Sequence, residues 1–172
     1  IINKKSGINF TAKGDKLLAK SSNLPIDILF VRDDDIPSLV SNGDADLAIV
    51  GENVLIEKTL FKKNNINKIL ELGFSKCRLS FAAPQNSLMK SVKNKKIATS
   101  YPNIVKKYLQ DNKIKASVTN IHGSVELTPY IGMSDCICDL VSSGATLEAN
   151  NLKELEVILE SQAVLIQNKK LN

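Results

Sequence analysis

Segments with the pattern of β-strands alternate with segments of helical pattern along almost the whole chain, and this alternation constrains the fold more than any other feature. Residues 26–31 are mostly apolar, residues 36–40 place apolar side chains at helical spacing, and Gly43 follows as a helix stop. This order is typical of an α/β fold with mixed, largely parallel sheets flanked by helices. Further strands are expected over residues 45–50, 77–83, 96–99, 116–121, 134–141, 155–159 and 162–167, and further helices over residues 52–58, 100–109, 124–130 and 142–152.

The strands fall into two blocks, which predicts two lobes. Residues 1–79 together with residues 160–172 are expected to form the first lobe, and residues 80–159 the second. The last strand is the candidate to return to the first lobe. A chain that crosses twice between two lobes forms a hinge, and ligands commonly bind at such domain interfaces.

Composition and charge narrow the class of partner. The 172-residue chain carries a net charge of +5 but only 5% aromatic residues, and its lysines are scattered in pairs. This pattern favours a solvated surface over a nucleic-acid face, which would interleave aromatic side chains with the basic ones. No apolar run reaches the roughly 18 residues that span a bilayer, and no secretory leader opens the chain. We therefore expect a cytoplasmic protein with no nucleic-acid or membrane partner, and a mild positive field suits small anionic substrates.

Arginine and cysteine are both scarce. Arg32 and Arg78 are the only arginines among 23 basic residues. Because the planar fork of arginine binds phosphate and carboxylate in a way that lysine cannot, both are candidate site residues, although two chance arginines are the alternative. Cys77, Cys136 and Cys138 have no disulfide or zinc-knuckle spacing, and we expect Cys136 and Cys138 to be buried thiols.

The turn DLVSSGAT at residues 139–146 is the strongest local signal. An apolar strand ends there, and small and hydroxyl residues open a helix. Such a turn offers backbone N–H groups, a positive helix end and hydroxyl donors, which together bind phosphate. Gly144 permits close approach of the backbone, and Asp139 is placed to accept hydrogen bonds from ribose hydroxyls. An ordinary strand-to-helix turn remains the alternative. The closing Gly-Lys of a Walker loop and the three glycines of a dinucleotide fingerprint are both missing.

Other polar residues follow the ends of predicted strands. The acids at residues 33–35 are expected either to cap the next helix or to bind Mg²⁺. Glu52 follows the strand at residues 45–50, where open α/β sheets hold their ligands. Ser100 is expected to cap a helix at a third junction, beside Tyr101. His122 is the only histidine, so a metal site built from histidines is excluded, and an exposed polar role is expected for it.

Several motifs, in order over nearly the whole chain, resemble the ATP phosphoribosyltransferase family. The resembling strings are PIDILFVRDDDIP at residues 25–37, ADLAIVGENVL at 45–55, GFSKCRLS at 73–80, IATSYP at 97–102, GSVE at 123–126 and CDLVSSGATLEAN at 138–150. The resemblance implies two lobes like those of type II periplasmic binding proteins. It also implies a glycosyltransferase that joins ATP to phosphoribosyl pyrophosphate (PRPP) with Mg²⁺. The products would be N1-(5-phosphoribosyl)-ATP and pyrophosphate, in the first step of L-histidine biosynthesis.

The resemblance also assigns residues to the two substrates. It implies that PRPP is bound by Asp139, Ser142, Ser143, Gly144, Ala145 and Thr146. ATP and pyrophosphate would be bound by Lys5, Arg32, Glu52, Arg78 and Tyr101. No residue is assigned as a general acid or base, and the metal ligands are not identified. The alternative is a two-lobe protein that binds a small molecule or senses an effector without catalysis.

The chain departs from the family pattern at both ends. The Lys5-Ser6-Gly7 opening continues directly into Ile8, without the arginine and first helix of the family. The sequences of residues 33–35 and 140–146 are more similar to those of the long form of the family. That form carries a C-terminal regulatory domain, which we do not expect within these residues. Histidine would act as a feedback inhibitor only through such a domain or a separate subunit. A homo-oligomer, dimer or hexamer, is expected.

Overall fold

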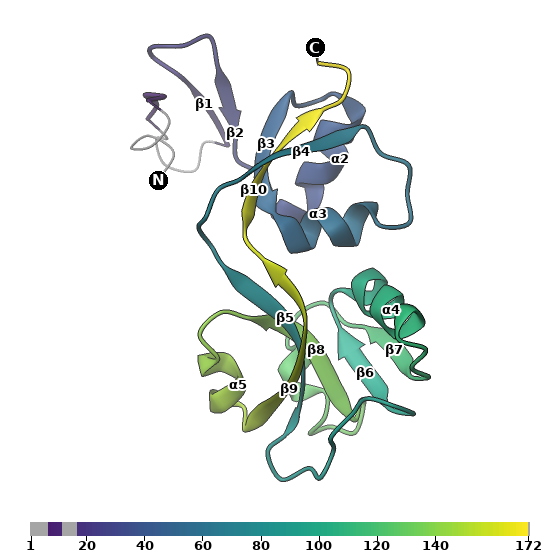
Figure 1. Cartoon of the computed structure of the whole chain (residues 1–172). Coiled ribbons are helices and arrows are strands. Elements are labelled where there is room, and N and C mark those ends of the chain that lie inside the picture. The colour runs from purple at the N-terminus through teal and green to yellow at the C-terminus, as the bar shows by residue number, and fades with distance from the viewer. Residues whose placement is uncertain (1–6, 12–16, 172) are drawn as a thin grey trace.

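The computed structural model describes residues 7–11 and 17–171, which form two lobes joined by two extended crossings (Figure 1). The first lobe holds a three-stranded sheet in the order β3-β10-β4. The second holds a five-stranded sheet in the order β7-β6-β8-β5-β9. The elements of the first lobe are β1 (Leu18–Lys20), β2 (Asp27–Leu29), the 3₁₀ helix η1 (Asp33–Asp35), α2 (Ile36–Asn42), β3 (Leu47–Gly51), α3 (Glu52–Thr59), β4 (Ile66–Glu71) and β10 (Ala163–Asn168). Those of the second are β5 (Cys77–Pro84), β6 (Lys96–Thr99), α4 (Pro102–Asp111), β7 (Ser117–Asn120), the 3₁₀ helix η2 (Val125–Leu127), β8 (Cys136–Val141), α5 (Ala145–Ala149) and β9 (Leu152–Ser161).

The two crossings run side by side and in opposite directions (Figure 1). The chain enters the second lobe through β5 and leaves it through β9, and Cys77 pairs with Ser161 at the start of this antiparallel pair. Beyond that point, the backbone N–H of Ala163 donates to the carbonyl of Phe74 at 3.0 Å. The N–H of Leu72 donates to the carbonyl of Ala163 at 2.9 Å. The crossings are therefore hydrogen-bonded to each other as well as to the lobes.

Mixed sheets are confirmed, but the expectation that they are largely parallel is wrong. Among the described strands, only β6 pairs in parallel, with β7 and β8, whereas β5 pairs antiparallel with β8 and β9. In the first lobe, β10 is antiparallel to both β3 and β4. For the pairs β5–β9 and β4–β10 the cause is the double crossing, because strands that leave and return to a lobe by way of a hinge run in opposite directions. The alternation of strands and helices in the sequence correctly predicted only the parallel pairing of β6 with β7 and β8.

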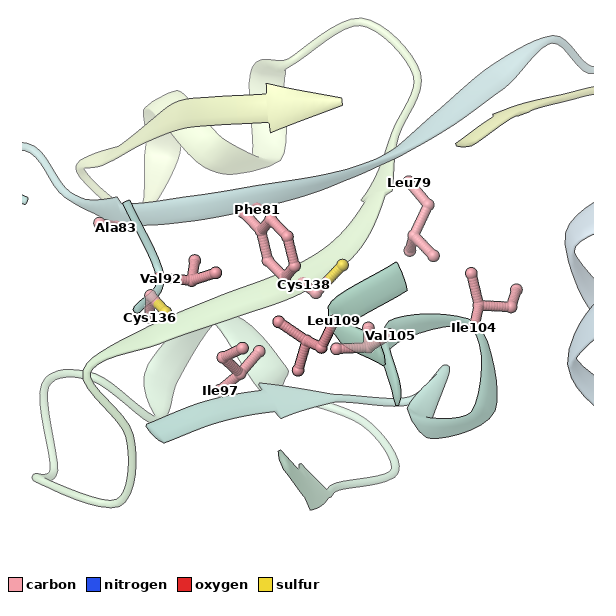
Figure 2. Close-up of a cluster of buried hydrophobic side chains, with 10 residues drawn as sticks. All are labelled: Leu79, Phe81, Ala83, Val92, Ile97, Ile104, Val105, Leu109, Cys136 and Cys138. Atoms are coloured by element: carbon pink, nitrogen blue, oxygen red, sulfur yellow. The ribbon is translucent and has the colours of Figure 1, made fainter. Parts of the chain in front are cut away.

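Strand β5 carries the core of the second lobe. Its side chains alternate between the two faces of the sheet, as the pleat of a strand requires. Leu79, Phe81 and Ala83 join the cluster beneath α4 that Figure 2 shows, with Cys136 and Cys138 of β8. Phe81 is fully buried and contacts the ring of Tyr108 edge-on, with centroids 5.7 Å apart. Ala82 faces the opposite cluster, which lies against α5 and η2.

The thiol prediction is confirmed for the two cysteines of β8. Cys136 and Cys138 are free and buried, whereas Cys77 is half-buried. Burial raises the pKa of Cys136 to about 12, so that thiol stays protonated and packs as a small apolar group.

Several predicted elements differ in extent from the observed ones. The helix expected over residues 124–130 is a single 3₁₀ turn, η2, and the helix expected to continue to residue 152 ends with α5 at Ala149. The strand expected over residues 155–159 is the ten-residue β9. Strand β4 lies in a stretch where no strand was predicted, and the short hairpin of β1 and β2 was expected only at its second strand. Within the described ranges, no helix is long and apolar enough to cross a membrane.

Candidate functional site

The turn after β8 has the backbone geometry that its sequence predicts. Gly144 adopts a left-handed conformation, with φ of 88° and ψ of −8°, and the helix α5 begins at the next residue. The side chains of the turn are exposed, and the Ser143 hydroxyl accepts a hydrogen bond from the Ala145 N–H at 3.3 Å. The turn therefore presents hydroxyl and backbone donors to solvent at the C-terminal end of β8.

Gly144→Ala is expected to lower the free energy of unfolding by about 1–2 kcal/mol, because a side chain disfavours the left-handed region. A Cβ at this position would meet no atom within 4 Å, so the backbone alone supplies the penalty. Urea unfolding measures the effect, with Ser143→Ala in the same turn as the control, expected to change stability by less than about 0.5 kcal/mol. Equal effects of the two substitutions would contradict the role of the left-handed turn.

Asp139 lies on β8 just before this turn, opposite Ser80 of β5. The carboxylate is half-buried, and its Oδ1 accepts a hydrogen bond from the Leu140 N–H at 2.8 Å. Burial raises the pKa of Asp139, the bond from Leu140 lowers it, and the negative charge of Glu126 raises it further. The second oxygen is a candidate acceptor for a ligand hydroxyl.

Arg78 connects the turn to β9. Its Nε and Nη2 atoms donate to the two oxygens of Glu154 at 2.6 and 2.7 Å, and its Nη1 donates to the Ser142 carbonyl at 3.4 Å. The Ser80 hydroxyl also donates to Glu154, at 2.6 Å. The pKa of Glu154 is lowered mainly by its bond to Arg78. Because both carboxylate oxygens are engaged, the guanidinium plane is fixed next to the turn at residues 142–146.

Tyr101 lies where the two lobes meet. Its hydroxyl accepts a hydrogen bond from Asn53 Nδ2 of the first lobe at 3.1 Å. Burial raises the pKa of Tyr101 to about 12, and the negative charges of Asp139, Asp33 and Asp34 add to that shift. These three carboxylates therefore lie within electrostatic range of one tyrosine, although they come from both lobes. We call the region where α3, the start of α4 and the end of β9 meet the lobe junction.

Two other predicted site residues, Glu52 and Arg32, lie on the first lobe. Glu52 opens α3, and its carboxylate accepts a hydrogen bond from Lys68 Nζ at 2.7 Å. Arg32 is exposed immediately before η1. Lys5 lies outside the described residues.

The acids of residues 33–35 were expected either to cap the next helix or to bind Mg²⁺. They form η1, and Asp35 occupies the N-cap position of α2, but its side chain makes no capping hydrogen bond among the described residues. Asp34 instead forms an ion pair with Lys58 at 3.0 Å. Ser100 does not cap α4 either, because the N-cap position belongs to Tyr101, whose side chain makes no capping bond.

No preformed metal cluster stands out. Within residues 7–11 and 17–171, no group of three histidine, cysteine, aspartate or glutamate side chains is placed to bind a metal ion. His122 is exposed and hydrogen-bonds Asn120 through Nε2 at 3.2 Å.

A pocket of about 420 Å³ is lined by Gln85, Asn86, Tyr130 and Asn151. It lies at the end of β5 away from the lobe junction, so it is separate from the residues above.

Sequence reasoning missed two acids that organise this region. Glu154 orients Arg78, and Glu57 of α3 accepts hydrogen bonds from the first turn of α4. Both contacts join residues far apart in sequence, by 76 and 47 positions. Glu57 lies on a helix with several buried side chains, whereas Glu154 lies on a strand whose side chains are mostly exposed or half-buried, so no sequence signal marked Glu154.

Comparison with known proteins identifies the family. The sequence model of the family described as ATP phosphoribosyltransferase matches residues 32–172. The curated ATP phosphoribosyltransferases of Azobacteroides pseudotrichonymphae and Cytophaga hutchinsonii are 50% and 48% identical to this chain, over 96% and 94% of its length. The alignments cover 58% and 56% of those two proteins, so the chain spans little more than half the length of these relatives.

Solved structures agree with this assignment. The ATP phosphoribosyl transferase (HisG:HisZ) complex from Thermotoga maritima is similar with a TM-score of 0.79 and 29% identity, over 96% of this chain and 79% of that one. The substrate-binding protein of an amino acid ABC transporter is similar with a TM-score of 0.59, over 84% of this chain and 66% of that one. At 15% identity that likeness shows the two-lobe fold alone. The chain belongs to the ATP phosphoribosyltransferase family.

Proposed function

We propose that the protein to which these residues belong joins N1 of the ATP adenine to C1 of PRPP and releases pyrophosphate. The product is N1-(5-phosphoribosyl)-ATP, in the first step of L-histidine biosynthesis. The observation that carries the proposal is the combination of Asp139, the turn at residues 142–146 and the Arg78 guanidinium in one place, within a chain of this family. These groups can receive a ribose, a phosphate and a second anion next to one another.

In this proposal PRPP lies on the second lobe. The turn residues Ser142, Ser143, Gly144, Ala145 and Thr146 bind the 5-phosphate through hydroxyl and backbone donors. Asp139 accepts hydrogen bonds from the ribose hydroxyls. The half-buried position of Asp139 strengthens such bonds, because fewer water molecules compete for the carboxylate.

ATP and the leaving pyrophosphate are then assigned to the lobe junction and to Arg78. Tyr101 is placed against the nucleotide, and Arg32, Glu52 and Lys5 complete the set proposed for ATP and pyrophosphate. Glu52 and Lys68 already form an ion pair, so a nucleotide hydroxyl or amino group must share or replace that contact. Arg78 offers its charge beside the turn to whichever phosphate group reaches it.

The chemistry requires binding and charge compensation more than proton transfer. A bond forms between adenine N1 and ribose C1 while the bond from C1 to the pyrophosphate oxygen breaks. Negative charge accumulates on the leaving group, where the Arg78 guanidinium and other cationic groups stabilise it. Holding two polyanions in line supplies much of the remaining rate enhancement. No general acid or base is assigned.

Mg²⁺ is proposed as the cofactor. The ion usually binds substrate phosphates with one or two carboxylates and keeps several water molecules. It would neutralise part of the charge on pyrophosphate. Asp33 and Asp34 are exposed, and we propose that these carboxylates face the ion, although Asp34 also pairs with Lys58 at 3.0 Å.

One assay tests the function. Full-length protein is mixed with ATP, PRPP and Mg²⁺ in the presence of pyrophosphatase, and product absorbance is followed over time. We expect product with all components and none when either PRPP or Mg²⁺ is omitted. Absence of product from well-folded full-length protein would overturn the proposal in favour of a non-catalytic binding protein.

Partners and location complete the proposal. We propose a cytoplasmic homo-oligomer, dimer or hexamer, which light scattering of the purified protein would measure. The relative from Thermotoga maritima was solved as a HisG:HisZ complex. Feedback inhibition by histidine is accordingly assigned to a domain or subunit outside these residues.

A further inference from the structure

Glu57 of the first lobe is a buried acid bonded to the backbone of the second lobe. Its side chain lies on α3 and is 6% exposed. The Asn103 N–H donates to Oε1 and Oε2 at 3.0 and 3.1 Å, and the Ile104 N–H donates to Oε2 at 3.0 Å. In return, Asn103 Nδ2 donates to the Glu57 backbone carbonyl at 3.0 Å. The two lobes are therefore joined here by side chain and backbone together.

The Glu57 carboxylate accepts hydrogen bonds from N–H groups in the first turn of α4, which no side chain of the preceding residue caps. The first N–H groups of any helix lack partners within the helix. The residue before α4 is Tyr101, which makes no side-chain cap, and Pro102 opens the helix. A carboxylate from the other lobe takes the place of a local cap and also faces the positive end of the helix. Burial raises the pKa of Glu57, while the bonds from Asn103 and Ile104 oppose that shift.

Asn53 makes a second contact one helical turn earlier on the same face of α3. Its Nδ2 donates to the Tyr101 hydroxyl at 3.1 Å. Its backbone N–H donates to the Ser161 hydroxyl at 3.0 Å, and that hydroxyl donates to Asn53 Oδ1 at 2.8 Å. One face of α3 thus contacts the end of β9, the Tyr101 hydroxyl and the first turn of α4.

The position of this contact matters for the relation between the lobes. In Figure 1, α3 and α4 face each other to one side of the two crossings. Two-lobe proteins move by rotation about their connecting strands. A buried, charged contact away from those strands resists such a rotation. Tyr101 lies between Asn53 and the start of α4, so its orientation depends on both.

We propose that Glu57 is a positioning residue that fixes the first turn of α4 against the first lobe and so holds Tyr101 in place for the adenine nucleotide. The positional part stands on the contacts alone, whereas the nucleotide part rests on the proposed function. Glu57 reaches the reacting groups only through α4 and Tyr101.

The first test measures the contact itself. Amide hydrogen exchange of full-length protein is compared among the wild type, Glu57→Gln, Glu57→Ala and the control Asp111→Asn. Asp111 lies at the other end of α4 and forms an ion pair with Lys107. We expect the Asn103 and Ile104 amides to lose protection in Glu57→Ala, to lose less in Glu57→Gln, and to be unchanged in the control. Equal protection in wild type and Glu57→Ala would overturn the positional part.

The second test measures ligand affinity by calorimetry with ATP and PRPP separately. We expect Glu57→Ala to weaken ATP binding about tenfold, from the loss of one charged hydrogen-bonding group, and to leave PRPP binding within about threefold. Glu57→Gln should recover part of the ATP affinity, because its carbonyl oxygen still accepts one N–H. A variant that is merely less stable would bind fewer equivalents of both ligands without this split.

The two proposals fail separately. Wild-type protein that makes no product would sink the proposed function, while hydrogen exchange would still decide the positional role. Equal weakening of ATP and PRPP by Glu57→Gln, which keeps the size of the side chain, would overturn the nucleotide part. If Glu57→Ala does not fold, Glu57→Gln alone carries both tests.

Discussion

Asp139→Ala is expected to weaken PRPP binding by about two to four orders of magnitude while changing ATP binding by less than about threefold. A carboxylate that accepts hydrogen bonds from two ribose hydroxyls contributes roughly 1.5–3 kcal/mol through each of them, and about 1.4 kcal/mol corresponds to a factor of ten. Asp139 is half-buried on β8, beside the turn proposed for the 5-phosphate. Separate calorimetric titrations with PRPP and ATP measure the two affinities.

The matched control is Asp135→Asn. Asp135 precedes the same strand at its other end, where its carboxylate accepts a bond from the Lys96 N–H at 2.8 Å. Removing that charge tests whether any change at an acid near β8 affects PRPP. We expect less than about threefold change in either affinity. Equal loss of PRPP and ATP affinity in Asp139→Ala would refute the assignment of this residue to the ribose.

The same carboxylate predicts a pH dependence. Burial raises the pKa of Asp139 above its ordinary value of 3.8, so the protonated form accumulates at less acidic pH than for an exposed aspartate. The protonated form accepts fewer hydrogen bonds, and PRPP affinity should fall as pH decreases toward that raised pKa. Asp139→Asn should lose this component and retain only the titration of the ligand phosphates. Identical pH profiles for wild type and Asp139→Asn would contradict the prediction.

The local part of the fold could be predicted because it depends on neighbours in sequence. Gly43 ends α2 in a left-handed conformation, with φ of 89°, as a glycine after a helical pattern predicts. The turn at Gly144 follows from the same property. The core strand β5 was predicted over residues 77–83 and is observed over Cys77–Pro84, with residues 79–83 buried on both faces.

The missed features depend on partners that sequence spacing does not reveal. Strand β4 exposes most of its side chains, so no apolar alternation marked it. Direction was also missed, because the pairing of β5 with β9 follows from the return of the chain between lobes. Within the site, Ser100 matched the pattern of a helix cap, but the cap of α4 is supplied by Glu57 from the other lobe. Family resemblance proposed Arg78 as a site residue, but its orientation by Glu154 required the structure.

Arg78→Ala is expected to lower kcat/KM for the proposed reaction by about a hundredfold, and Arg78→Lys by about tenfold. The guanidinium binds Glu154 through two nitrogens and still reaches the Ser142 carbonyl through a third. Lysine keeps the positive charge but cannot make these bonds in one plane. Alanine removes a charge-assisted contact to the substrate anion, worth roughly 1.5–3 kcal/mol, and leaves Glu154 as an unpaired negative charge beside the turn.

Variants of Glu154 distinguish the loss of the Arg78 contact with the substrate from the effect of leaving the Glu154 charge unpaired. If Arg78 acts on the substrate and Glu154 only orients it, Glu154→Gln should cost less than Arg78→Ala, and the double variant should resemble Arg78→Ala. Lys107→Ala removes an exposed ion pair on α4 and should change kcat/KM by less than about twofold. Additive losses in the double variant would show instead that the two residues act independently. In that case the guanidinium orientation seen next to Ser142 would have no bearing on the reaction, and Arg78 would contribute only charge.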